Sequence, residues 1–203
     1  MAVGNRCFRL GLVTLALWLG GGSVSFADMP TDQVKDTVGR VVTILRDPAL
    51  AREDKIAERR EALRQVILPR FDFSEMARRS LGSHWKNQKE RQEEFVAVFT
   101  NFVENTYVSK VESFKDEKIV FARERIEQNL AEVGTQIVPS KGEPFSLNYK
   151  LHLVGDDWKI YDVVIENISL VNNYRSQFNR ILANASFDEL LKKLREKGSG
   201  MGT

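Results

Sequence analysis

The spacing of hydrophobic residues divides the chain into a helical first half, a run of strands and a helical end. Between residues 31 and 107, hydrophobic residues recur at steps of three and four, the period of an amphipathic helix. Asn87, followed by Glu90 three residues later, resembles a helix-capping pair. The pattern predicts four helices: one from Thr31 to Asp47-Pro48, one from Ile56 to Pro69, a short one from Phe71 to Gly82 and a long one that starts near Asn87.

At about residue 117 the hydrophobic period changes to two, which is typical of strands with one buried face. The alternation predicts four strands, over residues 118–126, 130–138, 145–154 and 157–166. It is clearest in the third strand, where Leu147, Tyr149 and Leu151 alternate with polar residues. Gly155-Asp156 has the composition of a two-residue hairpin turn. We therefore expect an antiparallel sheet whose third and fourth strands form a hairpin.

The helical period returns after the strands, first from Ile168 to Leu182 and then in a last helix that Ser186 and Glu189 cap. Helices, then a sheet, then helices again indicate an α+β fold. No Pro/Gly/Ser-rich linker divides the chain, so we expect a single domain over residues 28–197. The Gly-rich residues 198–203 are expected to form a disordered tail.

Residues 1–27 have the features of an export signal. Arg6 and Arg9 precede an apolar run from Leu10 to Leu19, and small residues end the segment at Ala27. The alternative is an N-terminal anchor helix that stays attached, which the shortness of the apolar run disfavours. Residues 1–27 contain these two arginines and no acidic residue. Their removal lowers the number of basic residues from 30 to 28, which equals the number of acidic residues, 28. The mature protein would therefore be neutral.

Composition and motifs exclude several classes of chemistry. The chain is 42% hydrophobic and 29% charged, which is typical of a globular protein and not of a disordered one. Its one cysteine, Cys7, lies in the signal, so the mature chain has no thiol chemistry. The histidines His84 and His152 lack the spacing of metal ligands. Basic and acidic residues are interspersed, which argues against a nucleic-acid surface. We expect no metal, no cofactor and no catalytic residue.

Asp162 is the one carboxylate that could have a catalytic role, because the expected strand pairing puts it on the apolar face of the sheet. If Gly155-Asp156 is the hairpin turn, Leu153 lies opposite Trp158, and Asp162 lies opposite Tyr149. A carboxylate in such a place would be desolvated, as a general base requires. The alternatives are that Asp162 is bonded to the backbone or to a tyrosine, or that a bulge turns it outward.

Two segments resemble the signatures of a known family. Residues 161–178, with the sequence YDVVIENISLVNNYRSQF, are similar to one signature of the MlaC-type periplasmic phospholipid-binding proteins, also called the toluene-tolerance family. Residues 71–78, with the sequence FDFSEMAR, followed by Leu81-Gly82 and Trp85, resemble the other. Both segments occur in the order that the family shows, and the resemblance extends over the mature chain.

This resemblance implies a curved four-stranded antiparallel sheet, similar to the NTF2-like fold, packed against helices around a deep apolar cavity. It implies a soluble carrier in the periplasm, with phospholipid as cargo and no cofactor. The carrier would shuttle lipid between an outer-membrane lipoprotein complex and an inner-membrane ABC transporter complex, touching each transiently, and so maintain outer-membrane lipid asymmetry. For a shuttle we expect a monomer that binds no nucleic acid.

The wall of such a cavity would come from the apolar faces of the fourth helix, the third and fourth strands and the segment after them. The signature itself reaches Val163, Ile165, Ile168, Leu170 and Tyr174, whereas the other positions follow from which face they share. The expected lipid-binding residues are Phe99, Phe102, Val103, Tyr107, Leu147, Tyr149, Leu151, Val163, Ile165, Ile168, Leu170 and Tyr174. Arg175 is a candidate for the lipid phosphate, with a salt bridge to Glu166 or Asp162 as the alternative.

Two other functions stay open at this point. One is a small NTF2-like enzyme with Asp162 as general base and Tyr149 or Tyr161 as proton donor. The other is a periplasmic chaperone or binding module whose apolar groove accepts a peptide or another lipid, such as a hopanoid. Transport direction, headgroup and chain preference, the number of chains bound and the docking residues are not determined by the sequence.

Overall fold

The computed structural model describes residues 29–114 and 116–199, and in these ranges the elements follow the predicted order. The predicted export signal, residues 1–27, lies outside the described residues, as do residues 200–203 of the predicted tail. The helices are α1 (Pro30–Arg46), α2 (Ile56–Ile67), α3 (Phe73–Leu81), α4 (Gln92–Glu112), α5 (Leu170–Leu182) and α6 (Phe187–Gly198). The strands are β1 (Lys118–Glu127), β2 (Leu130–Val138), β3 (Phe145–Val154), β4 (Asp157–Ile165) and β5 (Ile168–Ser169).

The sheet contains five strands in the described residues, one more than predicted, in the order β1-β2-β3-β4-β5 with every neighbouring pair antiparallel. The additional strand, β5, pairs Ile168 with Ile165 across a turn in which Glu166 and Asn167 both have positive φ. Ile168, predicted to start a helix, is therefore a strand residue. The helix begins at Leu170, and its cap is Ser169, whose side chain accepts a hydrogen bond from the Asn172 amide.

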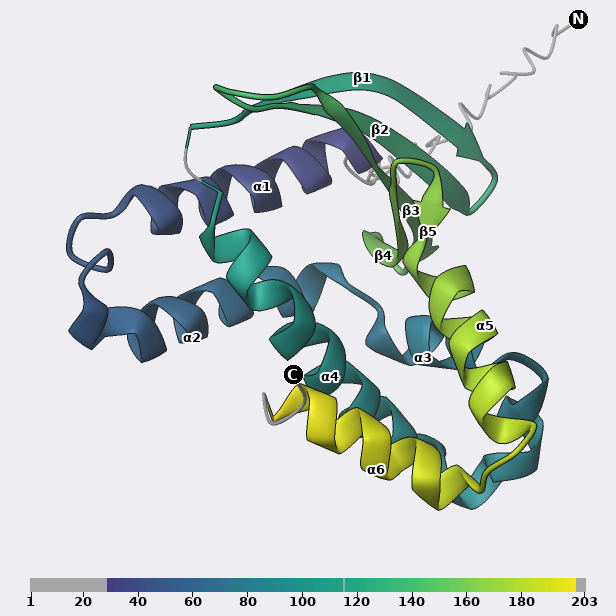
Figure 1. The fold of residues 1–203 in the computed structure, drawn as a ribbon. Helices are drawn as coiled ribbons and strands as arrows, with labels where there is room; N and C mark the ends of the chain where they lie inside the picture. The colour runs from purple at the N-terminus through teal and green to yellow at the C-terminus, as the bar shows by residue number, and fades with distance from the viewer. Residues whose placement is uncertain (1–28, 115, 200–203) are drawn as a thin grey trace, which may run out of the picture.

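The sheet lies at one end of the molecule, and most of the helices gather at the other (Figure 1). Helix α1 runs along β1 and β2 on one face of the sheet, which we call the inner face. Helices α3, α4, α5 and α6 pack on one another, with α4 against α6 and α3 against α5. The α1–α2 hairpin projects to one side of this helical group.

An aromatic cluster fills the core of the helical end. Phe95 and Phe99 of α4 are fully buried and meet Phe178 of α5 edge to face. Tyr174 stacks on Phe178, and Phe187 at the start of α6 lies 5.8 Å from Phe95 between ring centroids. The helical spacing of these residues on α4 and α5 places each ring on the buried side, where aromatic pairs add to the stability that burial provides.

The entrance to α4 differs from the prediction. Residues Gly82–Arg91 form a 3-10 segment, η3, and α4 begins at Gln92 with no side-chain cap. The Asn87–Glu90 pair therefore does not cap this helix. The turn from α3 into η3 depends on Gly82, which has φ 59° and ψ −129°, a conformation that side chains strongly disfavour.

Strand β1 forms one edge of the sheet and is irregular. Its pairing with β2 shifts between Phe121 and Arg123, which marks a β-bulge at this edge. Beyond the bulge, the Arg123 side chain lies over Gly134 of β2 and forms an ion pair with Glu132. Charged side chains thus cover the outer side of the sheet close to its exposed edge.

Two glycine substitutions are expected to change stability in opposite directions. Gly82→Ala should lower the free energy of unfolding by about 1–3 kcal/mol because alanine is strained at this φ and ψ. Gly39→Ala should raise it by about 0.5–1 kcal/mol, since Gly39 lies within α1 and an added Cβ meets no atom within 4 Å. Urea denaturation of both variants checks the prediction. A stabilising Gly82→Ala would show that the backbone at Gly82 is not strained.

Candidate functional site

The inner face of the sheet carries a continuous row of apolar residues. Side chains that lie directly opposite each other in antiparallel strands share a face. Three such pairs follow one another across β3 and β4: Leu151 with Ile160, Tyr149 with Val163, and Leu147 with Ile165. The hairpin that aligns them has Gly155-Asp156 as its turn and pairs Leu153 with Trp158, both as predicted.

This row changes from a closed core to a half-open surface along its length. Leu151 and Ile160 are 0% and 2% exposed. Leu147 and Ile165, two pairs further along, are only half-buried, and Phe145 at the start of β3 is 36% exposed. The apolar face therefore extends beyond the part of the sheet that the helices cover completely.

Helices α4 and α5 contribute two tyrosines to the same region. Tyr174 of α5 meets Phe102 of α4 edge to face, with 5.3 Å between ring centroids. Its hydroxyl donates a hydrogen bond of 3.2 Å to the hydroxyl of Tyr107, one helical turn after Phe102. Tyr174 is buried and Tyr107 is half-buried against the core cluster, so the pair joins the closed core to a partly exposed residue.

The tyrosine hydroxyls of this region are uncharged at neutral pH. Burial raises the pKa of Tyr174 well above its ordinary value, and the hydrogen bond with Tyr107 raises it further. Burial also raises the pKa of Tyr149. An apolar surface with neutral hydroxyls suits the burial of hydrocarbon and not the stabilisation of a charged intermediate.

The structure distributes the predicted lipid-binding residues over three environments. The buried ones are Phe99, Phe102, Val103, Leu151, Val163, Leu170 and Tyr174. The half-buried ones, packed against the core, are Tyr107, Leu147, Tyr149 and Ile165. Ile168 is 60% exposed at the end of the sheet. The half-buried group is the part of the prediction that lies on an accessible apolar surface.

The sequence reasoning missed the contribution of β1 and β2 to this face. Phe121 pairs with Thr135, and Thr135 pairs with Leu147, so all three side chains share the inner face. Thr135 is buried, and its hydroxyl donates a hydrogen bond to the Leu147 carbonyl, which satisfies it within the apolar surroundings. The alternation in residues 118–126 and 130–138 was the signal that could have identified these positions.

Asp162 does not lie on the apolar face, which corrects the predicted pairing. The register shifts after Ile160, so that Tyr161 is an extra residue, Asp162 lies opposite Lys150, and Val163 takes the place opposite Tyr149. Asp162 is 3% exposed and accepts hydrogen bonds from the Ser169 hydroxyl at 2.6 Å and from the Val171 amide at 3.1 Å. It therefore attaches β4 to the start of α5, in line with the alternatives of a bulge and a bond to the backbone.

The two signature segments meet on the other side of the sheet from the apolar row. Asp72 caps α3 and binds His152 of β3 with 2.9 Å between Oδ2 and Nε2. The Arg79 guanidinium lies over the ring of Tyr161 at 4.1 Å. Arg175 donates a hydrogen bond to the Arg79 carbonyl and packs beside Gly82, instead of forming the suggested salt bridge. These contacts hold α3, β4 and α5 together.

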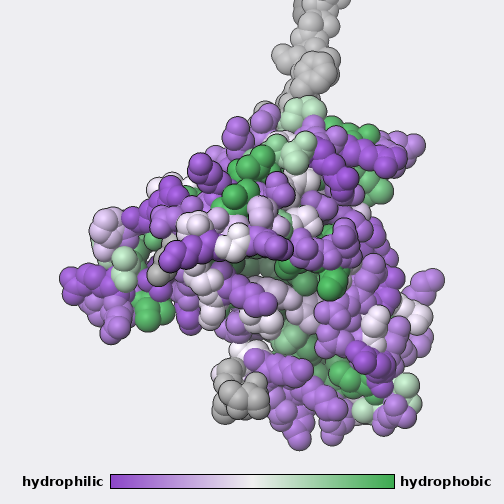
Figure 2. Space-filling model, turned by 45° about the horizontal axis from the view of Figure 1, so that its top comes forward, coloured by the Kyte–Doolittle hydropathy of each residue, from purple (hydrophilic) through white to green (hydrophobic). Residues whose placement is uncertain are grey.

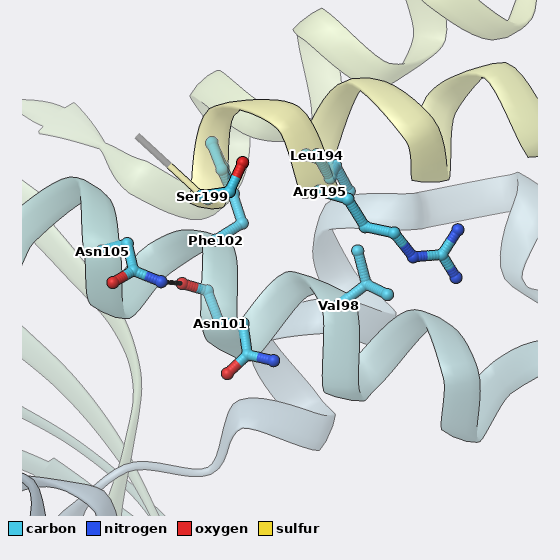
Figure 3. A pocket seen from close by; sticks show the side chains of 8 residues that line it. Val98, Asn101, Phe102, Asn105, Leu194, Arg195 and Ser199 are labelled. Carbon is cyan, nitrogen blue, oxygen red and sulfur yellow. Dashed lines mark hydrogen bonds between the residues drawn. The ribbon is translucent and has the colours of Figure 1, made fainter. Parts of the chain in front are cut away.

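A separate pocket of about 340 Å³ lies between α4 and the end of α6 (Figure 3). Val98, Asn101, Phe102 and Asn105 line it from α4, and Leu194 and Arg195 line it from α6, with Gly198 and Ser199 at the end. Phe102 is the one predicted lipid-binding residue in this lining. The pocket is therefore distinct from the half-buried inner face.

The surface offers few other candidates. Hydrophilic residues predominate on the face shown in Figure 2, where hydrophobic residues appear in separate patches. Within residues 29–114 and 116–199, no group of three or more His, Cys, Asp or Glu could hold a metal ion. In the same ranges, no helix is both long and apolar enough to cross a membrane.

Comparison with known proteins gives three findings. A family model described as MlaC protein matches residues 35–196. The intermembrane phospholipid transport system binding protein MlaC of Haemophilus influenzae is 24% identical over 146 residues, which are 69% of this chain and 68% of that protein. A phospholipid-binding protein from Ralstonia solanacearum, solved in complex with a phospholipid, has a TM-score of 0.74 at 24% identity, covering 86% of this chain and 99% of that one. The structural match shows a shared fold.

The role of Asp162 can be tested by its removal. Asp162→Ala leaves the Val171 amide and the Ser169 hydroxyl without their acceptor, so we expect the free energy of unfolding to fall by about 2–4 kcal/mol. Asp157→Ala on the same strand is the control, and its exposed ion pair with Lys159 should contribute less than about 1 kcal/mol. Urea denaturation measures both. Equal, small effects would mean that Asp162 does not attach α5 to the sheet.

Proposed function

The chain belongs to the MlaC protein family, and from this premise we propose that it is a periplasmic carrier that binds phospholipid and moves it between membranes without changing it chemically. The resemblance of its two signature segments to this family is confirmed by the family model. The Haemophilus influenzae relative is named as a phospholipid transport binding protein, and the Ralstonia solanacearum relative was solved with a phospholipid. Those names describe binding and transport, and they support a carrier over an enzyme.

The observation that carries this proposal is the half-buried apolar row on the inner face of the sheet. Leu147, Tyr149 and Ile165 are packed against the core but retain exposed surface. Apolar surface of this kind is unfavourable in water and favourable against hydrocarbon. An acyl chain that lies along this row would complete its burial and would continue the apolar face formed by the buried Leu151 and Val163.

The tyrosine pair marks one boundary of the proposed lipid site. Tyr107 and Tyr174 bond to each other through their hydroxyls, which removes the cost of burying an unpaired polar group beside hydrocarbon. Phe102 and Leu170, both buried, lie close to this pair in the core cluster and extend the apolar wall. The predicted lining thus provides side chains of low polarity from α4, β3, β4 and α5.

The energetics of acyl chains explain why such a carrier needs partners. Each buried methylene contributes about 0.8 kcal/mol, so two long chains nominally exceed the practical limit of about 20 kcal/mol for non-covalent binding. The lipid would therefore leave very slowly into water. Release requires a partner that offers a continuous apolar path. We propose that the protein docks transiently to an outer-membrane lipoprotein complex and to an inner-membrane ABC transporter complex. This transport would maintain the lipid asymmetry of the outer membrane.

A catalytic use of Asp162 finds no support in its surroundings. Both of its oxygens accept hydrogen bonds from the segment Ser169–Val171, and the residue lies on the face away from Tyr149. Another lipid, such as a hopanoid, would meet the same apolar row. Extraction of the bound molecule with organic solvent distinguishes that cargo from phospholipid.

The proposal predicts that the purified protein carries phospholipid that native mass spectrometry detects. Val163→Trp places a larger side chain in the apolar row beside Tyr149 and should weaken lipid binding roughly tenfold, because the indole would displace one or two acyl methylenes, each of which contributes about 0.8 kcal/mol when buried. The measurement is the fraction of lipid-bound protein. The variant's melting temperature, recorded in parallel, shows whether the domain still folds.

Val120→Trp is the matched control, since Val120 is 46% exposed and lies opposite the exposed Gln136, on the face away from the apolar row. Its lipid occupancy should equal that of the unchanged protein. Empty protein from several gentle preparations would contradict the proposed function. A folded Val163→Trp variant with full occupancy would place the lipid elsewhere.

A further inference from the structure

The outer half of the α1–α2 hairpin has little packing to the core. On α1 the buried residues are Pro30, Gln33, Val34 and Thr37, all in its first half. On α2 they are Leu63 and Val66, and neither belongs to the main core cluster. Between Thr37 and Leu63, the described chain contains no buried residue. The hairpin is thus anchored at its base and projects beyond it (Figure 1).

This outer half nevertheless carries apolar side chains. Val41, Val42, Ile44 and Leu45 of α1 are half-buried, and none is among the residues packed against the core. Helix α1 runs along β1 and β2, on the inner face of the sheet. The last two turns of α1 therefore carry hydrocarbon that the protein core does not fix.

Ion pairs hold α2 against α4. Helix α2 packs closely along α1, whereas it reaches α4 through long charged side chains. Arg59 and Arg60 both bind Glu112, at 3.1 Å and 2.8 Å between nitrogen and oxygen. Arg64 binds Glu104 at 3.2 Å. We call these five residues the α2–α4 ion-pair seam.

The seam is partly protected from water, which increases its strength. The side chains of Glu112 and Arg59 are 11% and 16% exposed. The hydrogen bonds from Arg60 and Arg59 hold the pKa of Glu112 below its usual range, so this carboxylate stays charged at neutral pH. Burial raises the pKa of Glu104, and one of its oxygens is buried without a hydrogen-bond partner, so Glu104 depends on Arg64 as its counter-charge.

We propose that the α1–α2 hairpin is a movable wall of the lipid site, and that the α2–α4 ion-pair seam holds it closed. A seam made of charges at the edge of an apolar site can separate in water, because each charge regains hydration, whereas a packed apolar seam cannot. Opening exposes the hydrocarbon of α1 to a partner that supplies an apolar path. The role in lipid release rests on the proposed function, but the motion of the hairpin does not.

The test uses charge reversal followed by restoration. Arg64→Glu places a third carboxylate beside Glu104 and Glu61 and should open the seam. Arg64→Glu with Glu104→Arg restores an opposite pair across the same two helices. Hydrogen exchange of the amides in residues 41–62, measured on lipid-free protein, should be roughly five- to tenfold faster in the single variant and return to the original rate in the double variant. Arg64→Gln is the milder substitute if Arg64→Glu fails to fold.

A second experiment tests the role in lipid release. It measures the transfer of a fluorescent phospholipid from loaded protein to phosphatidylcholine vesicles. The single variant should transfer roughly five- to tenfold faster, and the double variant at the original rate. Arg78→Glu is the control, because Arg78 binds Glu75 within α3 at similar exposure, and it should change neither measurement. The proposal is overturned if hydrogen exchange in residues 41–62 is unchanged in the single variant. It is also overturned if the second substitution fails to restore the original exchange rate. Protein that binds no lipid but shows the exchange pattern contradicts only the carrier function.

Discussion

The apolar inner face of the sheet is unfavourable in water, and the arrangement of the helices depends on how they cover it. Near the β3–β4 turn, Leu151 and Ile160 are buried and belong to an ordinary close-packed core. Toward the other end, Leu147 and Ile165 share the same face but are only half covered. One continuous surface thus serves as a core at one end and as a candidate ligand surface at the other.

The two signature segments meet through polar contacts on the side of the sheet away from the apolar row, although Val163 and Ile165 of the second segment belong to that row. Asp72 binds His152 of β3, the Arg79 guanidinium of α3 lies over the Tyr161 ring of β4, and Arg175 of α5 donates a hydrogen bond to the Arg79 carbonyl. Each of these contacts requires a particular polar group in a particular place. An acyl chain, in contrast, requires only apolar surface, which many side chains provide equally well. The polar residues of the signature segments therefore build the frame, whereas the apolar residues that we expect to bind lipid are less distinctive.

The sequence predicted the elements well and their local irregularities poorly. The period of two located β2 and β3 to the residue, and Gly155-Asp156 aligned β3 with β4, because both signals repeat or follow from turn chemistry. The extra residue at Tyr161 leaves no trace in the pattern, yet it moves Asp162 to the other face. The two-residue β5 is too short to show alternation. Of the predicted site, the apolar character could be predicted but the exposure of each residue could not, because exposure depends on which helix covers it.

The bulged edge at β1 bears on how the molecule exists in solution. An exposed strand edge offers unpaired amide and carbonyl groups to any other strand, including the same edge of a second copy. The register shift after Phe121 breaks the spacing that a partner strand would have to match, and beyond it Arg123 and Arg125 form ion pairs with Glu132 and Glu127. Two copies that approach edge to edge would find no regular ladder of hydrogen bonds. Self-association through this edge is thereby disfavoured, so the half-covered apolar face can remain exposed without the sheet edge starting aggregation.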